Sequence, residues 1–248
     1  MLKTFELEKF SDKDLGIQLS SFVDSIKIVS AGNLKSIILF GGVAKGDYTK
    51  GKSNTNILFV FDQIDLNVLD QLSIPFQKAI ADFQFSPFLL TTSEVEPVKK
   101  VFAVKLFDIQ QHHVLLYGED LIGKLDINKE NLRFISEQEL RNQLSRMKFF
   151  YIQNFNIPEK LLDRIKKSFT TLLVNANTYL FLKTGVYYKT RDEIIAQLIH
   201  EPNMDKITLE DLTLLKSGKL QPDKEQTRSL YERLMLQYKY IIKDLEKL

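Results

Sequence analysis

The chain has 248 residues, of which 44% are hydrophobic and 27% are charged, and its formal net charge is +2. This composition is typical of a folded globular protein with one large domain or two modest ones, and it argues against nucleic-acid binding through bulk positive charge. The absence of cysteine excludes disulfides and thiolate chemistry. No apolar stretch approaches the roughly 20 residues that a membrane-spanning helix needs. The N-terminus also lacks the apolar core of a signal peptide, so we expect a cytoplasmic protein without membrane contact.

The first half of the sequence alternates between helical and strand patterns. A helix is expected from Ser11, which with Asp14 is close to a capping box, up to Gly32. Short apolar runs predict strands at 36–40, 56–61, 85–91 and 114–117. Further helices are expected at 74–83, with Pro75 in the first turn, and at 93–102. This alternation indicates a mixed sheet flanked by helices.

From about residue 130 onward the pattern is purely helical. Helix starts are expected at Ser136 with Glu139, at Pro158, at Thr190 with Glu193, at Thr208 with Asp211, and at Pro222-Asp223. Gly185 is expected to end the second of these helices. We therefore predict an α+β fold in which a sheet domain at 1–128 precedes an all-α helical bundle at 129–248. Residues 1–128 hold 13 Lys, no Arg and 16 acidic residues, a charge of −3, whereas residues 129–248 carry a charge of +5.

A glycine turn followed by two asparagines is the most informative feature of the sequence. Gly41 and Gly42 directly follow the expected strand at 36–40, and Asn54 and Asn56 stand at the start of the next one. Backbone amides at a strand–turn–helix junction favour phosphate, and glycine allows close approach. Residues two apart on a strand point to the same face, which suits two side chains that jointly hold a metal ion. That chemistry needs carboxylates, and this chain has amides.

This stretch resembles the signature of the polymerase-beta-like nucleotidyltransferase superfamily, in which a glycine turn precedes Asp-x-Asp at the start of the next strand. Lys45 lies in an Ala-Lys-Gly-Asp run that resembles the usual Ala-Arg-Gly-Asp, and Ser53 precedes the asparagine pair. Asn54 and Asn56 fall on the two Asp positions that would hold magnesium. The nucleotide-binding residues that the resemblance implies are Gly41, Gly42, Lys45, Ser53, Asn54 and Asn56.

A second stretch, at 101–120, resembles a group of bacterial predicted nucleotidyltransferases with a C-terminal helical domain. That group shares Asp-Ile, matched by Asp108-Ile109, and Leu-Tyr-Gly-Glu-Asp, which this chain has at 116–120. The resemblance covers roughly residues 35 to 150. Lys105 stands where the group usually has Glu. Together with Asn54 and Asn56 it makes three degenerate positions, which indicates impaired catalysis.

We therefore predict a nucleotidyltransferase-family protein that is catalytically impaired, holds no metal, and retains nucleotide binding at Gly41-Gly42. Magnesium and a nucleoside triphosphate belong to the prediction only if the protein is active. One alternative is a magnesium-dependent enzyme that transfers a nucleoside monophosphate to a small molecule or protein, with a metal site rebuilt from Asp47, Glu94 or Glu96. Another is a non-catalytic partner in a two-component system that acts through its helical domain. The sequence leaves open whether the protein forms a homodimer.

Other side chains carry weaker functional expectations. Lys50 and Lys52 are candidates for phosphate contacts, but lysines in a polar loop usually contact water. His112-His113 could suggest metal ligands, but three histidines without cysteine argue against a zinc site. The aromatic residues Phe149, Phe150, Tyr151 and Phe155 are expected in the helical core. Tyr187, Tyr188 and Arg191 are candidates for lining the cleft of an acceptor substrate.

Overall fold

The structure is a computed structural model that describes residues 13–248 apart from residues 31, 47, 49 and 52. The expected helix start at Ser11 and the candidates Asp47 and Lys52 lie outside the described residues. The chain divides into two compact units, Met1–Asp126 and Ile127–Leu248. That these units correspond to domains at 1–128 and 129–248 stays a prediction.

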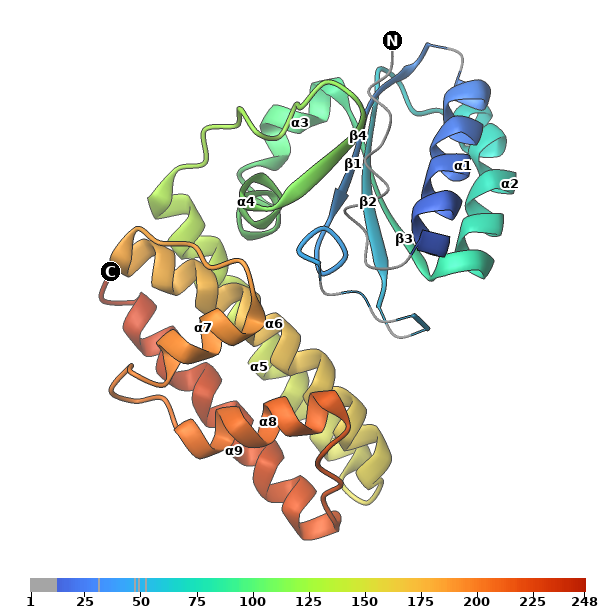
Figure 1. Cartoon of the computed structure of the whole chain (residues 1–248). Coiled ribbons are helices and arrows are strands. Elements are labelled where there is room, and N and C mark those ends of the chain that lie inside the picture. The colour runs from blue at the N-terminus through green and yellow to red at the C-terminus, as the bar shows by residue number, and fades with distance from the viewer. Residues whose placement is uncertain (1–12, 31, 47, 49, 52) are drawn as a thin grey trace. The chain divides into compact units, whose positions relative to one another are not determined.

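The first unit is built on a four-stranded mixed sheet (Figure 1). Its strands are β1 (Leu34–Phe40), β2 (Thr55–Phe61), β3 (Phe85–Thr91) and β4 (His113–Gly118), in the order β3-β2-β1-β4. β1 pairs antiparallel with both β2 and β4, whereas β2 and β3 run parallel. The inner strands β1 and β2 are buried along most of their length, because helices cover both faces of the sheet.

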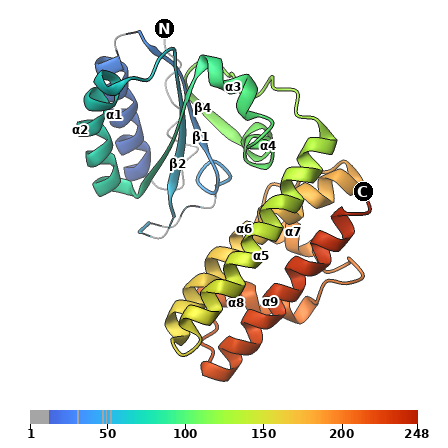
Figure 2. The ribbon, with the colours of Figure 1, turned by 180° about the vertical axis from the view of Figure 1, so that it is seen from behind.

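Two helices, α1 (Lys13–Ser30) and α2 (Leu66–Phe83), cover one face of the sheet (Figures 1 and 2). We call it the α1–α2 face and define it by the strand residues Ile37, Leu39, Ile57 and Phe59, which join one apolar cluster with α1 and α2. Aromatic rings fill this cluster, and Phe22 of α1 lies 5.0 Å from Phe85 between ring centroids. This face therefore holds much of the apolar packing of the unit.

Helices α3 (Thr92–Val98) and α4 (Ala103–Gln111) lie on the opposite side of the sheet (Figures 1 and 2). We call this side the α4 face and define it by Phe40, Asn56 and Phe88. Phe102, which precedes α4, packs on Phe88 with ring centroids 5.6 Å apart. Most of the helix is buried, including Val104 and Leu106, whereas Lys105 is half-buried.

The second unit is helical throughout the secondary structure assigned to it. It comprises α5 (Lys129–Asn154), α6 (Pro158–Thr184), α7 (Arg191–Leu198), α8 (Lys206–Ser217) and α9 (Lys224–Leu245). The helix α6 supplies much of the core and packs against α5 and α9. The fully buried hydroxyl of Ser136 in this unit donates to Asn175 Oδ1 at 2.9 Å. The predicted α+β class, with a mixed sheet and a helical C-terminal part, is confirmed.

Most strand and helix positions follow the sequence prediction, but three helix starts were wrong. The helix α2 begins at Leu66 rather than at 74, because Asp65 caps it and Pro75 lies in its interior. The helix α5 begins at Lys129 with Asn128 as its cap, so Ser136 is an internal, fully buried residue. The helix α8 is capped by Asp205, three residues before the expected Thr208. The starts of α6, α7 and α9 and the end of α6 at Gly185 are confirmed.

Among the described residues, no helix combines the length and the apolar character needed to cross a membrane.

Candidate functional site

The glycine turn after β1 is held in a compact form that favours glycine at position 41. Gly41 has φ +73°, and the backbone N–H of Lys45 donates to the carbonyl groups of Gly41 and Gly42, each at 3.1 Å. A Cβ atom on Gly41 would lie 2.8 Å from Nδ2 of Asn56. A larger residue at position 41 would therefore be strained by the backbone conformation and would have to displace the Asn56 amide.

The structure brings Asn56 against this turn, so that two of the residues named by the resemblance lie side by side. Asn56 pairs with Phe40 across β1 and with Ser86 across β3. Its Nδ2 donates to the carbonyl oxygen of Asn54 at 3.3 Å. Asn54 is exposed immediately before β2, whereas Asn56 is half-buried. The donor end of the Asn56 amide thus lies between the turn and the beginning of β2.

Lys105 lies over the same face of the sheet, but it comes from a helix. It is the third residue of α4, and its Nζ lies 3.8 Å from the ring centroid of Phe88 and 5.5 Å from that of Phe40. Phe40 is the cross-strand partner of Asn56, and Phe88 is two residues beyond its parallel partner, so all three side chains share the α4 face. Where the resemblance implies a carboxylate, the structure has an ammonium group over two rings.

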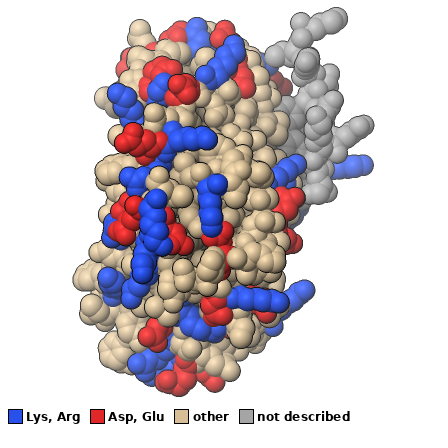
Figure 3. Space-filling model, turned by 90° about the vertical axis from the view of Figure 1, so that its left-hand side faces the viewer, with Lys and Arg blue, Asp and Glu red and all other residues tan. Residues whose placement is uncertain are grey.

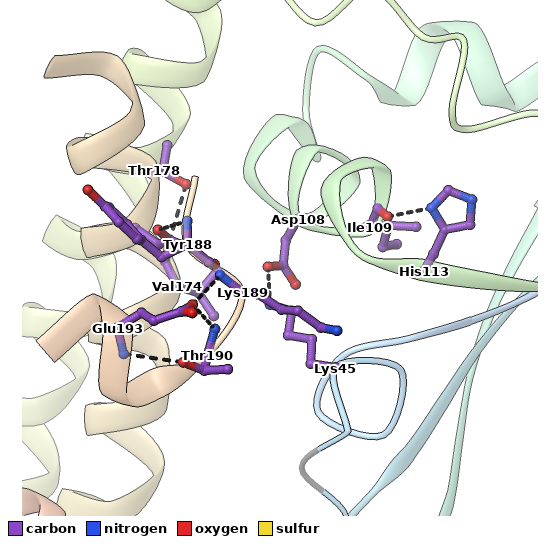
Figure 4. A network of polar contacts seen from close by, with 11 residues as sticks. Lys45, Asp108, Ile109, His113, Val174, Thr178, Tyr188, Lys189, Thr190 and Glu193 are labelled. Atoms are coloured by element: carbon purple, nitrogen blue, oxygen red, sulfur yellow. Dashed lines mark hydrogen bonds and ion pairs between the residues drawn. The ribbon is translucent and has the colours of Figure 1, made fainter. Parts of the chain in front are cut away.

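Lys45 is not directed to solvent, because its ammonium is paired with a carboxylate of α4. Its Nζ lies 2.5 Å from Oδ1 of Asp108 (Figure 4), and the two side chains are only 16% and 12% exposed. This ion pair fixes the glycine turn to α4. The sequence prediction gave Lys45 a role in phosphate binding and gave Asp108 none. The missed signal was an acidic residue within an otherwise apolar helical segment.

Ser53 lies on the other side of the sheet from Asn56. It lines a cavity of about 270 Å³ together with residues from the start of α1 and the end of α2, among them Leu15 and Phe83. Lys50, another candidate for phosphate contact, lines the same cavity and pairs with Asp14 at 3.3 Å. Ser53 and Lys50 therefore do not join the group formed by the turn, Asn56 and Lys105.

The acidic residues that could rebuild a metal site have other partners where the structure describes them. Glu94 caps α3 by accepting from the Thr91 N–H at 2.7 Å, and Glu96 pairs with Lys99 at 2.6 Å. Within the described part of the chain there is no group of three or more acidic, histidine or cysteine side chains arranged to hold a metal ion.

The histidine at the edge strand has structural contacts. The His113 ring contacts the Ile109 carbonyl oxygen at 2.8 Å through Nδ1 (Figure 4) and Asp120 at 3.3 Å through Nε2. These contacts join β4 to the end of α4 and to the following loop.

The side chains of Asn54, Asn56 and Lys105 are two amides and one ammonium group, and they do not match the carboxylate ligands that magnesium prefers.

In the helical unit, the segment that carries Tyr187 and Tyr188 is anchored by one buried amide. Asn177 of α6 donates from Nδ2 to the Tyr188 carbonyl at 2.7 Å and accepts from the Tyr188 N–H at 3.0 Å. Thr190 and Glu193 then form the predicted capping box of α7, visible in Figure 4. The structure thus explains how this segment is held, and the role of Tyr187, Tyr188 and Arg191 in an acceptor site stays a prediction.

The aromatic residues at the end of α5 divide into two groups. Phe150 and Tyr151 pack against the helical core, as predicted. Phe149 is 62% exposed and Phe155 is 50% exposed, so the prediction that they are core residues was wrong. The helical spacing places Phe149 on the outer side of α5, which the run of adjacent aromatic letters did not reveal.

Charged side chains of both signs are interspersed on the molecular face drawn in Figure 3. Such mixing agrees with the small net charge of +2 and gives that face no extended basic patch.

Comparison with protein-family models and with curated proteins gives no match. Among solved structures, the chain is similar to spectinomycin adenyltransferase AAD(9) from Enterococcus faecialis, whose crystal structure contains ATP and spectinomycin. The TM-score is 0.59 and the sequence identity 15%, and the match covers 93% of this chain and 98% of that chain. The chain therefore has a nucleotidyltransferase fold that extends over both units.

Proposed function

We propose that this protein binds a nucleotide on the α4 face, beside the glycine turn, and does not carry out metal-dependent nucleotidyl transfer. The observation that carries this proposal is the contact between Gly41 and Asn56, where a Cβ atom would lie 2.8 Å from the amide nitrogen. This contact brings the glycine turn and the asparagine motif of the sequence together. The similar structure, which contains ATP, supports a nucleotide as the ligand of this fold.

The turn and the asparagine pair have the chemistry of an anion site. Glycines 41 and 42 have no side chains, so a phosphate group can approach their backbone closely. The Asn56 amide lies beside the turn, and an amide nitrogen can donate to a phosphate oxygen. Lys105 adds a positive charge on the same face. These groups favour a phosphate-bearing ligand over a neutral one.

The same groups argue against catalysis. In phosphoryl transfer, metal ions neutralise the charge that develops on the transferring group, and carboxylates hold those ions. Asn54 and Asn56 can offer only neutral carbonyl oxygens. The loss of two charged ligands should lower the rate by several orders of magnitude, since each 1.4 kcal/mol is about a factor of ten. Glu94 and Glu96 support no replacement, because they cap α3 and pair with Lys99.

One observation favours a second candidate function, contact with a protein partner through the helical unit. Phe149, Ile152 and Phe155, near the end of α5, are 62%, 70% and 50% exposed. Exposed apolar residues close together on a helix are a common feature of protein-binding surfaces. This candidate requires no nucleotide, so the binding experiment separates the two.

The test is calorimetric titration of the full-length protein with ATP and with GTP, for the wild type and Gly41→Ala. We expect binding by the wild type and a loss of at least about tenfold in Gly41→Ala, because the new methyl group displaces the Asn56 amide and its hydrogen bond. The control is Gly32→Ala. Gly32 has a similar φ of +87°, but its added Cβ would meet nothing within 4 Å. It reports backbone strain alone, and nucleotide affinity should stay within about twofold of wild type.

A parallel incubation with labelled ATP or GTP and a cell extract tests catalysis. We expect no label on any acceptor. Incorporation that Gly41→Ala abolishes and Gly32→Ala retains would contradict the proposed lack of transfer. Absence of heat with every nucleotide would contradict nucleotide binding and leave contact with a protein as the remaining function.

A further inference from the structure

One end of the helical unit holds two arginines beside a pair of tyrosine rings. Figures 1 and 2 show that α5 ends where α6 and α9 begin. The Nε of Arg228 donates to the Tyr151 hydroxyl at 3.0 Å, and the ring centroids of Tyr151 and Tyr231 lie 5.4 Å apart. Burial raises the pKa of Tyr231, and the charge and a hydrogen bond of Arg164 act against that rise. Side chains from α5, α6 and α9 therefore meet at this end.

Arg164 is half-buried and differs from another covered arginine of this unit in its partners. Its guanidinium carbon lies 5.4 Å from the centroid of the Phe150 ring, and its Nε is buried without a hydrogen-bond partner. Among the residues that the structure describes, no carboxylate forms an ion pair with it. Arg233 also has a buried Nε without a partner, but its Nη2 pairs with Asp211 at 2.8 Å. A ring face and a hydroxyl leave the charge of Arg164 in place, whereas a carboxylate would offset it.

A covered guanidinium group of this kind suits a ligand that brings the missing negative charge. A buried charge loses hydration, and an opposite charge supplied from outside offsets that loss. The planar guanidinium presents its N–H donors in a fork that matches the oxygens of a phosphate or a carboxylate. Arg228 adds a second guanidinium at the tyrosine pair, and its side chain is 47% exposed, with Glu225 3.6 Å away. A ligand can therefore reach this end of the unit from solvent.

We propose that Arg164 and Arg228 form an anion-binding site at this end of the helical unit, and that its ligand is a small molecule with a phosphate group. Two guanidinium groups carry two positive charges, which match a phosphate dianion better than a carboxylate monoanion. The Tyr151 hydroxyl accepts from Arg228 and can donate its own proton to a further phosphate oxygen. The site is built from residues of the helical unit alone, so it does not depend on the nucleotide binding proposed at the glycine turn.

The experiment is calorimetric titration of the full-length protein with inorganic phosphate at about pH 8, where phosphate is mainly a dianion. Titration with sodium chloride of the same ionic strength is the reference. We expect saturable binding of phosphate, competition by sulfate, and weaker binding of acetate, because sulfate shares the charge and shape of the phosphate dianion. Phosphate should also raise the midpoint temperature of unfolding, since a ligand that binds only the folded state stabilises it. This part uses the unmodified protein, so it does not depend on whether a variant folds.

Three variants assign the binding to the two arginines. Arg164→Met keeps a long apolar stem beside the aromatic ring but removes the charge, and it should lower phosphate affinity by about tenfold or more, the usual size of a charge-assisted hydrogen bond. Arg228→Met should lower the affinity in the same direction. The control is Arg141→Met, which removes a positive charge of α5 that is already paired with Glu137 and Glu246. Its phosphate affinity should stay within about twofold of wild type, because salt screens a charge outside the site.

Urea denaturation, with circular dichroism to check folding, separates a binding role of Arg164 from a purely structural one. Without phosphate, Arg164→Met should be at least as stable as the wild type, because it no longer covers a charge that lacks a carboxylate. Phosphate should then stabilise the wild type and leave the variant unchanged. A purely structural arginine would give the opposite pattern, a less stable variant with unchanged phosphate affinity.

Three results would overturn the inference and leave the proposed function standing. The first is the absence of phosphate binding by the wild type at matched ionic strength. The second is a folded Arg164→Met protein that binds phosphate as tightly as the wild type does. The third is phosphate binding that Gly41→Ala abolishes and Arg164→Met retains, which would assign the anion to the glycine turn.

Discussion

The two faces of the sheet in the first unit differ in what their side chains contribute. On the α1–α2 face the aromatic rings contact one another closely, with Phe76 and Phe85 4.9 Å apart and Phe59 and Phe76 5.2 Å apart between centroids. On the α4 face, charged and amide groups gather where β1 ends and β2 begins. Since neighbouring residues of a strand point to opposite faces, Asn56 and Ile57 contribute to different sides. Apolar packing on one face thus supports polar groups on the other.

This comparison implies that apolar packing and the proposed nucleotide binding are separable within one short strand. Ile57 and Phe59 are fully buried in the apolar cluster, whereas Asn56 between Thr55 and Ile57 is half-buried beside the turn. The α4 face is not polar throughout, because Leu58 and Val60 are also fully buried on it. The residues of the proposed binding site lie at its end near the turn. Substitutions on the two faces should therefore have different effects.

The largest expected effect comes from emptying the aromatic cluster. Phe59 is fully buried and lies within 6.3 Å of four other phenylalanine rings between centroids, and its truncation would leave a large cavity. We expect Phe59→Ala to lower the free energy of unfolding by about 3–5 kcal/mol. Urea denaturation followed by circular dichroism measures the change.

The control for this substitution keeps most of the volume. Phe59→Leu should cost less than half as much, because a smaller cavity remains. The Phe59→Ala variant should bind ATP as the wild type does at temperatures where it is still folded. A loss of ATP affinity in folded Phe59→Ala would break the proposed separation of the two faces.

A smaller effect is expected from breaking the ion pair that joins the glycine turn to α4. Asp108→Ala would leave the Lys45 ammonium largely buried without its carboxylate, since both side chains are mostly covered. Removal of one partner of a fully buried pair costs about 3–5 kcal/mol, so this partly covered pair should cost about 2 kcal/mol. Urea denaturation should show this loss, and ATP affinity should also fall because the turn is no longer held.

A double substitution distinguishes the stranded charge from the loss of the contact. The double variant Asp108→Ala, Lys45→Met no longer has the Lys45 ammonium that the single variant leaves without its carboxylate. Much of the lost stability should therefore return, while the turn stays unanchored. Stability that does not recover in the double variant would mean that the buried charge is not the cause of the loss.

Much of the fold was predictable because local signals and packing agree. The capping box of Thr190 and Glu193, and Gly185 with φ +79°, mark helix ends through their own backbone chemistry. Ser136 and Glu139 have the same spacing as a capping box, yet they lie inside α5. Ser136 instead donates to Asn175 of α6, a partner 39 residues away that no local pattern can reveal. Local spacing alone therefore could not distinguish a cap from a buried contact.

The site was predictable only along the strands. The sequence placed Gly41 at the end of one expected strand and Asn56 at the start of the next, and the pairing of those strands brings the two residues together. The contacts of α4 were not anticipated, since 101–109 was read only as a motif and its helical form was missed. Without a helix there, the sequence gives no means of placing Lys105 over Phe40 and Phe88. A long-range cation–π contact depends on how elements dock, which spacing does not encode.

The smallest effect is expected from a buried hydroxyl group, which is neutral in the folded protein, unlike the ion pair of Lys45 and Asp108. In the helical unit, Tyr231 is fully buried and donates from its hydroxyl to the Met147 carbonyl at 2.8 Å. Burial raises the pKa of Tyr231 to about 12, because an ionised phenol would lose its hydration. The unfolded chain releases the proton near pH 10, so between pH 10 and pH 12 the folded state binds more protons. The stabilisation is complete below pH 10 and is lost as the pH rises through about 12.

We therefore expect the free energy of unfolding to decrease from pH 9 to pH 11, with Tyr231 accounting for about 1 kcal/mol of the decrease. Tyr231→Phe should lose less stability over this interval than the wild type, because it has no phenol to ionise. Burial raises the pKa of Tyr238 in the same direction, so a residual decrease is expected in the variant. Urea denaturation of both proteins at the two pH values isolates Tyr231 by difference. An equal decrease in the free energy of unfolding for the two proteins would mean that the buried Tyr231 hydroxyl ionises without a cost in stability.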